Sequence, residues 1–157
     1  MCLLILTLLT LTASTFSKPT IYEFVGQFGF PPGVLPDSVT TYSTSESDGF
    51  TNFAIYLSKP CYVKYEYLVY FDQEITGKAT YGQISDVKGL KVQALGIWFT
   101  VNEIKVDGNS LQFNIGFMTV KADIAQYQSI PSCKDEALAA CNDRSSKLIS
   151  QLQVTAE

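Results

Sequence analysis

Residues 75–117 read ITGKATYGQISDVKGLKVQALGIWFTVNEIKVDGNSLQFNIGF, and this stretch decides the fold because it holds strand and turn signals with almost no helical periodicity. Near its end, apolar residues alternate with polar or small ones at Leu111, Phe113, Ile115 and Phe117. A period of two predicts a strand with one buried and one solvated face. Asp107-Gly108-Asn109-Ser110, just before it, predicts a hairpin turn because Asp-Gly and Gly-Asn tolerate positive φ.

The strand before this hairpin changes phase. Its first apolar residues share one parity up to Val101, whereas Ile104 and Val106 lie on the other. Side chains of a regular strand alternate strictly, so the two sets cannot face the same side without an interruption. The sequence therefore predicts a β-bulge near Asn102 and Glu103.

Composition limits the class of protein. The chain has 157 residues, which predicts one domain with a proper core. Aromatic residues make up 13% and charged residues 17%, with a net charge of −4, which fits a β-rich globular protein and not a binder of nucleic acid or anionic lipid. The sequence contains no histidine, which removes histidine-dependent catalysis and the commonest metal ligand.

The first residues, MCLLILTLLTLTASTF, form an apolar run that is short for a transmembrane span. We predict a signal peptide over residues 1–17, since Thr15 and Ser17 satisfy the small-residue rule for cleavage before Lys18. The alternative is a buried N-terminal element. Cleavage would give a secreted protein of the apoplast or cell wall with no transmembrane span, a single β-rich domain over residues 18–133, and a variable helical or disordered tail over residues 134–157.

Local signals predict the other elements. Thr20-Ile21-Tyr22-Glu23 is a capping box, which predicts a helix over residues 21–28 that stops at Gly29. Phe30-Pro31-Pro32-Gly33-Val34-Leu35-Pro36 predicts a loop packed on the body. We further expect strands over residues 39–42, 53–57, 63–71 and within 118–127, a polar turn at 43–49, and a turn or strand edge at 72–74.

Several segments resemble the plant family known as domain of unknown function 538. They are the Phe30–Pro36 loop and Cys61-Tyr62-Val63, Ile75-Thr76-Gly77, Tyr81-Gly82-Gln83-Ile84, Lys88-Gly89-Leu90-Lys91-Val92, and Trp98 with Val101-Asn102-Glu103-Ile104. The resemblance covers residues 21–133. It implies a mainly β, compact antiparallel β-barrel-like domain with a short N-terminal helix. For function, the resemblance implies three expectations. The protein would be similar to the lipid-binding bactericidal/permeability-increasing proteins, would hydrolyse chlorophyll, or would act in stress responses and development.

Cysteines are candidates for a disulfide. Signal cleavage removes Cys2 and leaves Cys61, Cys133 and Cys141. An oxidising compartment favours pairing. The family resemblance at Cys61 and Cys133 favours that pair, Cys133 with Cys141 is the alternative, and unpaired structural cysteines remain a third possibility.

Aromatic residues are the speculative ligand-binding candidates. Tyr65, Tyr67 and Trp98, with their neighbours Tyr62 and Tyr70, would line an apolar cavity for a sterol, acyl chain or porphyrin. The plainer interpretation is core and sheet-face packing, since aromatic residues favour strands.

Catalytic signals are weak. Asp72 and Glu74 form the most glycosidase-like carboxylate pair, for which a solvated turn is the plainer interpretation. The sequence has no Gly-x-Ser-x-Gly elbow and no phosphate loop or metal-spaced cluster, so we expect no catalytic residue, metal or cofactor. Our leading hypothesis is a secreted, non-enzymatic protein that binds a lipid-like or apolar ligand. The alternatives are an ester hydrolase, acting for example on chlorophyll, and a cell-wall interaction protein without a small ligand.

Overall fold

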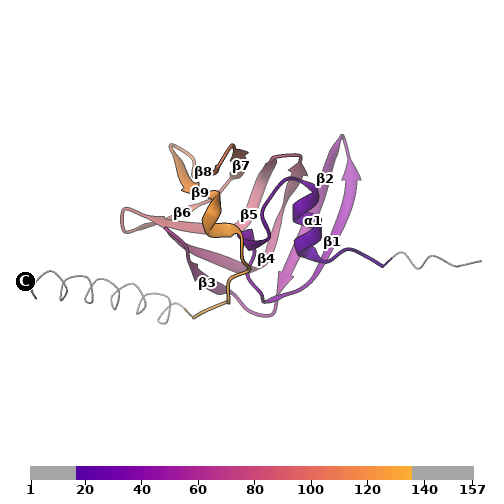
Figure 1. Cartoon of the computed structure of the whole chain (residues 1–157), viewed down its shortest axis with the longest axis horizontal. Helices are drawn as coiled ribbons and strands as arrows, with labels where there is room; N and C mark the ends of the chain where they lie inside the picture. The colour runs from indigo at the N-terminus through magenta and orange to yellow at the C-terminus, as the bar shows by residue number, and fades with distance from the viewer. Residues whose placement is uncertain (1–16, 136–157) are drawn as a thin grey trace, which may run out of the picture.

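The computed structural model describes residues 17–135. Residues 1–16 of the expected signal peptide, residues 136–157 of the expected tail, and with them Cys2 and Cys141, lie outside this part. The described chain is mainly β, as predicted, and is built around one nine-stranded antiparallel sheet (Figure 1). Its elements are α1 (Ile21–Gln27), η1 (Pro32–Val34), β1 (Val39–Ser47), β2 (Phe50–Leu57), β3 (Cys61–Lys64), β4 (Leu68–Thr80), β5 (Gln83–Ala94), β6 (Ile97–Thr100), β7 (Glu103–Asp107), β8 (Ser110–Asn114), β9 (Thr119–Asp123) and η2 (Ile124–Tyr127).

The sheet follows the order β1-β2-β4-β5-β7-β8-β9, with β3 on β4 and β6 on β5. Within residues 17–135 no ladder joins β1 to β9, so the sheet is open and the barrel-like closure expected from the family resemblance is not confirmed. No helix in this part of the chain has the length and apolarity needed to cross a membrane.

Helix α1 forms as predicted. The Thr20 hydroxyl accepts a hydrogen bond from the Glu23 amide at 3.2 Å, and the Glu23 carboxylate accepts one from the Thr20 amide at 2.8 Å. The helix ends at Gln27, and Gly29 follows with a φ of +81°. Such a left-handed glycine is a common helix stop. The helix buries Ile21, Phe24 and Val25 toward the sheet.

The first hairpin corrects one prediction. Strand β1 continues to Ser47, so residues 43–47 are strand and not a polar turn. Only Asp48 and Gly49 form the loop, with φ values of +53° and +79°. Two consecutive positive φ values are typical of the type I′ turn, which matches the twist of a hairpin.

The long strand expected over residues 63–71 is instead the β3–β4 hairpin. Val63 pairs with Val69 and Cys61 with Phe71 across it. The hairpin is centred on Glu66, so each residue of β3 pairs with the residue of β4 that is equally far from Glu66 in sequence. Paired residues therefore both have odd numbers or both have even numbers. Alternation therefore cannot distinguish this hairpin from one straight strand.

Residues 72–74 do not form a turn. They lie within β4, which runs unbroken from Leu68 to Thr80. The pairing of β4 with β5 shifts register between Phe71 and Thr76, which leaves this polar segment exposed on an irregular stretch of strand.

The predicted phase change takes the form of a break between β6 and β7. Val101 and Asn102 belong to neither strand, yet Val101 and Ile104 are both buried. The backbone stays paired through the break: Val101 N–H donates to Leu90 O at 3.0 Å, and Asn102 N–H donates to Asn114 O at 2.9 Å. The interruption thus lets the odd-numbered Val101 and the even-numbered Ile104 both face the core.

Candidate functional site: an apolar loop surface

The interior between α1 and the sheet is nearly filled. A cavity of about 50 Å³ remains there, lined only by apolar side chains that include Phe24, Phe28 and Phe71. Pockets for drug-sized ligands typically measure about 300–1,000 Å³. This interior cavity is therefore too small to hold a sterol, an acyl chain or a porphyrin in the described conformation.

The aromatic candidates are not brought together in one cavity wall. Tyr65 is stacked on Tyr127, with ring centroids 4.5 Å apart, and its hydroxyl donates to Gly33 O at 2.6 Å. Burial, with Tyr127 and Cys61 nearby, raises the pKa of Tyr65. Tyr67 packs against the core from the same β3–β4 turn, whereas Trp98 lies on β6. None of the three lines the interior cavity.

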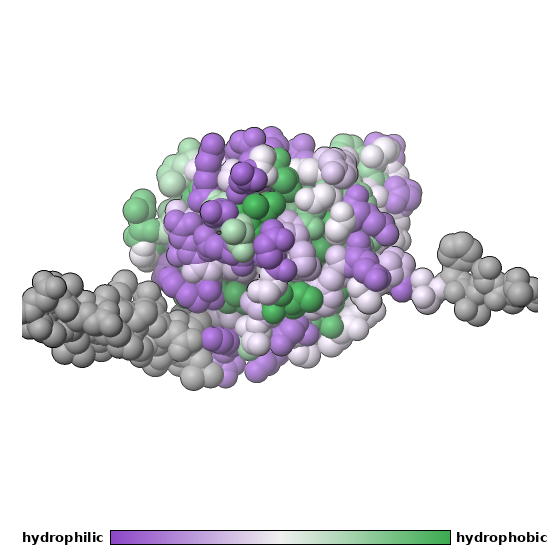
Figure 2. All heavy atoms as spheres, viewed as in Figure 1, coloured by the Kyte–Doolittle hydropathy of each residue, from purple (hydrophilic) through white to green (hydrophobic). Residues whose placement is uncertain are grey.

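The β5–β6 hairpin carries exposed apolar side chains at its tip. Leu95 is 86% exposed and Ile97 is 58% exposed. The tip projects from the body in Figure 1, and hydrophobic atoms gather at the same end in Figure 2. Leu95 has a φ of +54° and Gly96 a φ of +75°, so a leucine occupies a left-handed turn position that usually holds asparagine, aspartate or glycine.

A second loop adds to this tip. Phe117, between β8 and β9, is 77% exposed, which corrects its sequence assignment to the buried face of a strand. Strand β8 ends at Asn114, and a tight turn follows in which Ile115 N–H donates to Met118 O at 3.0 Å. The Phe117 ring meets Phe99 of β6 edge-on, with centroids 5.5 Å apart. We call Leu95, Ile97 and Phe117 the apolar loop surface.

Aromatic rings flank this surface on the β3–β4 side. Tyr62 lies between Tyr70, at 5.1 Å, and Trp98, at 5.9 Å between ring centroids. The Lys91 ammonium lies 5.9 Å from the centroid of Tyr70. The apolar loop surface thus continues through Trp98 into a group of tyrosine rings, each of which carries a polar hydroxyl.

The two loops contain no charged residue. Residues 92–102 lie uncharged between Lys91 and Glu103, and residues 108–120 lie uncharged between Asp107 and Lys121. The sequence interpretation missed this surface because it assigned Leu95, Ile97 and Phe117 to strand faces. The glycine of the Leu95-Gly96 pair is the sequence signal that could have indicated the turn between β5 and β6.

A polar hollow of about 840 Å³ opens over β2, β4 and β5, with Asn52, Asn102 and Lys88 in its lining. Within it, Lys78 pairs with Asp86 at 3.1 Å. Asp72 and Glu74 are exposed and line neither this hollow nor the interior cavity. The carboxylate pair therefore lies outside both the apolar cavity and the polar hollow.

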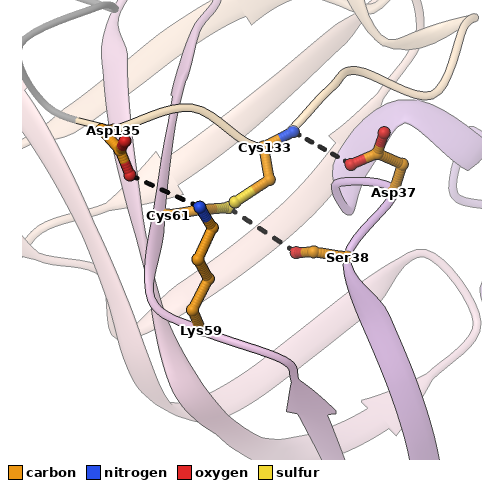
Figure 3. Close-up of polar contacts among 6 residues, drawn as sticks. All are labelled: Asp37, Ser38, Lys59, Cys61, Cys133 and Asp135. Atoms are coloured by element: carbon orange, nitrogen blue, oxygen red, sulfur yellow. Dashed lines mark hydrogen bonds and ion pairs between the residues drawn. The ribbon is translucent and has the colours of Figure 1, made fainter.

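Cys61 and Cys133 lie beside each other (Figure 3). An antiparallel bridge holds their backbones together, because Tyr62 N–H donates to Lys134 O at 2.8 Å and Lys134 N–H donates to Tyr62 O at 3.1 Å. Both thiols are free in this structure. Burial, with Cys133 adjacent, raises the pKa of the Cys61 thiol to about 12.

The comparison with protein families identifies the family of this chain. The model of the family described as "Protein of unknown function, DUF538" matches residues 21–128, from α1 to the end of η2. The chain belongs to this DUF538 family. A relative of this DUF538 protein, an uncharacterized protein of Arabidopsis thaliana, is 26% identical over 96 residues. The match covers 60% of this chain and 55% of that protein, so the chain spans only about half the length of this relative.

Proposed function

We propose that this protein is a secreted, non-enzymatic binding protein that recognises a lipid-like or apolar partner at its surface. The observation that carries the proposal is the apolar loop surface, where Leu95, Ile97 and Phe117 are 86%, 58% and 77% exposed. Large apolar side chains clustered on exposed loops are typical of an interaction site. The interior cavity of about 50 Å³ argues that the partner is contacted from outside and not enclosed.

Secretion is supported by the N-terminal apolar run and by the cysteine pair. Cys61 and Cys133 lie side by side, as a disulfide in an oxidising compartment requires. The pairing is part of the proposal, as is delivery to the apoplast or cell wall.

A hydrolase is the less favoured candidate. The sequence has no histidine, and the Asp72 and Glu74 carboxylates lie outside both hollows described above. The polar hollow of about 840 Å³ is large enough for an ester substrate, but the lysine and carboxylate of Lys78 and Asp86 in its lining form an ion pair with each other at 3.1 Å.

The experiment is a binding and turnover assay. The protein, secreted from plant cells that express the full chain, is incubated with a total leaf lipid extract, separated from free lipid by gel filtration, and analysed by lipid mass spectrometry. We expect intact lipid to co-elute with the protein and no products of ester cleavage. Release of fatty acid or phytol would favour the hydrolase, and absence of any associated lipid would contradict the proposal.

A further inference from the structure

We infer that the apolar loop surface is a membrane-docking tip, which inserts into the interface of an electrically neutral lipid bilayer. The inference rests on the proposed function and specifies its partner. It is carried by the shape of the tip, the backbone at Leu95, the charge of the two loops and the flanking aromatic rings.

The tip is convex. The β5–β6 hairpin projects from the sheet (Figure 1), and Leu95 and Ile97 lie at its end. Phe117 lies on the β8–β9 loop and contacts Phe99 of β6. The contact between Phe99 and Phe117 joins the two loops into one unit. A projecting pair of loops can enter a fluid interface, whereas it offers little flat area for a second copy of the chain.

The backbone at Leu95 argues for a function of its side chain. Residues of the described chain other than glycine with positive φ are Asp48, Asp86 and Leu95. Aspartate tolerates this conformation, but leucine is disfavoured there. At the equivalent position of the β1–β2 turn the chain has Asp48. A leucine that is both strained and 86% exposed stabilises neither the turn nor the core, so we assign it to a contact with an apolar partner.

The charge of the loops matches a neutral surface. Residues 92–102 and 108–120 contain neither lysine nor arginine, and the net charge of the chain is −4. Anionic lipids attract clusters of basic residues, which these loops do not offer. The loops also contain no acidic group that would have to be desolvated on insertion.

The flanking rings fit the polar boundary of a bilayer. Tryptophan and tyrosine favour the headgroup level, because an apolar ring there keeps a polar edge in contact with water. Trp98 follows Ile97 directly in β6, and its ring contacts Tyr62, which in turn contacts Tyr70. With the tip inserted, these three rings would lie at the headgroup level. Leu95, Ile97 and Phe117 would then reach the acyl boundary.

The test uses the secreted full chain and flotation with phosphatidylcholine vesicles. We expect the wild-type protein to float with the vesicles, and Leu95→Asn and Phe117→Ser each to weaken partitioning about tenfold or more, because each removes one large inserted side chain. Tyr81→Ser is the matched control. Tyr81 is 80% exposed on the β4–β5 turn, at the opposite end of β5, so its removal should leave partitioning unchanged.

Other outcomes separate this inference from the proposed function. If lipid co-elutes in gel filtration but Leu95→Asn floats like wild type, lipid binding stands and the docking tip is wrong. If adding phosphatidylserine strengthens wild-type partitioning several-fold and salt reverses this gain, the neutral preference is overturned. If gel filtration without lipid shows a dimer that Leu95→Asn dissociates, the surface is an interface between copies and the inference fails. Because Asn is suited to the turn, a raised denaturant midpoint will show that Leu95→Asn is folded.

Discussion

The ring of Phe99 in β6 meets the ring of Phe117 in the β8–β9 loop at a centroid distance of 5.5 Å and an interplanar angle of 66°. Edge-to-face geometry of this kind is favourable for aromatic pairs. The contact joins a strand to a loop far from it in sequence, since β7 and β8 lie between them. It holds Phe117 beside the β5–β6 hairpin and makes one apolar loop surface from two loops.

A double-mutant cycle will measure this contact. We expect Phe99→Leu, Phe117→Leu and the double variant to give a coupling free energy of about 0.5–1 kcal/mol in urea unfolding, since Phe117 is largely exposed. Free energies that add within experimental error would show that the two loops are not coupled.

Leu95→Asn should stabilise the fold while it weakens lipid binding. Relief of the left-handed leucine should raise the free energy of unfolding by about 1 kcal/mol. The urea midpoint should rise with an unchanged m-value. The control is Asp48→Asn at the matching turn position, which should change the midpoint little. A lower midpoint for Leu95→Asn would contradict the role assigned to its backbone.

The Cys61–Cys133 pair should be oxidised in the secreted protein. Peptide mapping without reduction is expected to recover the two cysteines linked, and recovery of both as alkylated thiols would disprove the pairing. Because the bond closes a long loop, reduction should lower the free energy of unfolding by about 2–4 kcal/mol. Cys141→Ser serves as the control, since it removes the alternative partner and should leave this loss unchanged.

Reduced protein should lose stability at alkaline pH. Burial raises the pKa of the Cys61 thiol from 9.0 to about 12, so the folded state binds the thiol proton more tightly than the unfolded state. The contribution is complete below pH 9 and is lost as the pH rises toward 12. The urea midpoint of the reduced wild type should therefore fall toward that of Cys61→Ala as the pH rises across this range. A constant difference between the two midpoints would contradict the raised pKa.

Gly33→Ala should destabilise the domain. An added Cβ would lie 2.3 Å from Tyr127 O and 2.4 Å from Ser129 O, both backbone atoms. The proline-containing loop would have to move away from η2, and overpacking of this kind costs about 1–3 kcal/mol. Gly26→Ala is the control, because a Cβ there meets nothing within 4 Å. Thermal unfolding compares the two, and equal midpoints would show that the loop can shift freely.

Local signals in the sequence were enough for some elements. The capping box at Thr20 and Glu23 predicts α1 because both of its hydrogen bonds form within four residues. The Asp107–Ser110 turn predicts the β7–β8 hairpin for the same reason, since Asp107 pairs with Ser110. Packing of the proline-containing loop was also predicted, and Phe30 and Leu35 are buried.

Other features depend on contacts that local patterns do not record. The β3–β4 turn contains neither glycine nor proline, and it is held by the Tyr65 bond to Gly33 O and by the Glu66 amide bond to Gln126 at 2.6 Å. Phe117 continues an alternating pattern but lies beyond the end of β8. Apolar residues at the tip of a loop and on a core face share the same composition, so the candidate site could not be separated from core by pattern alone.

The most direct measurement is quenching of Trp98 by brominated phosphatidylcholine. Trp98 is the single tryptophan of the chain and follows Ile97 of the apolar loop surface, so no other tryptophan contributes to the emission. We predict a blue shift on addition of phosphatidylcholine vesicles, strong quenching by shallow brominated lipid, and loss of both effects in Leu95→Asn. Unchanged emission at lipid concentrations where the protein floats with vesicles would contradict the account, because another face would then contact the lipid.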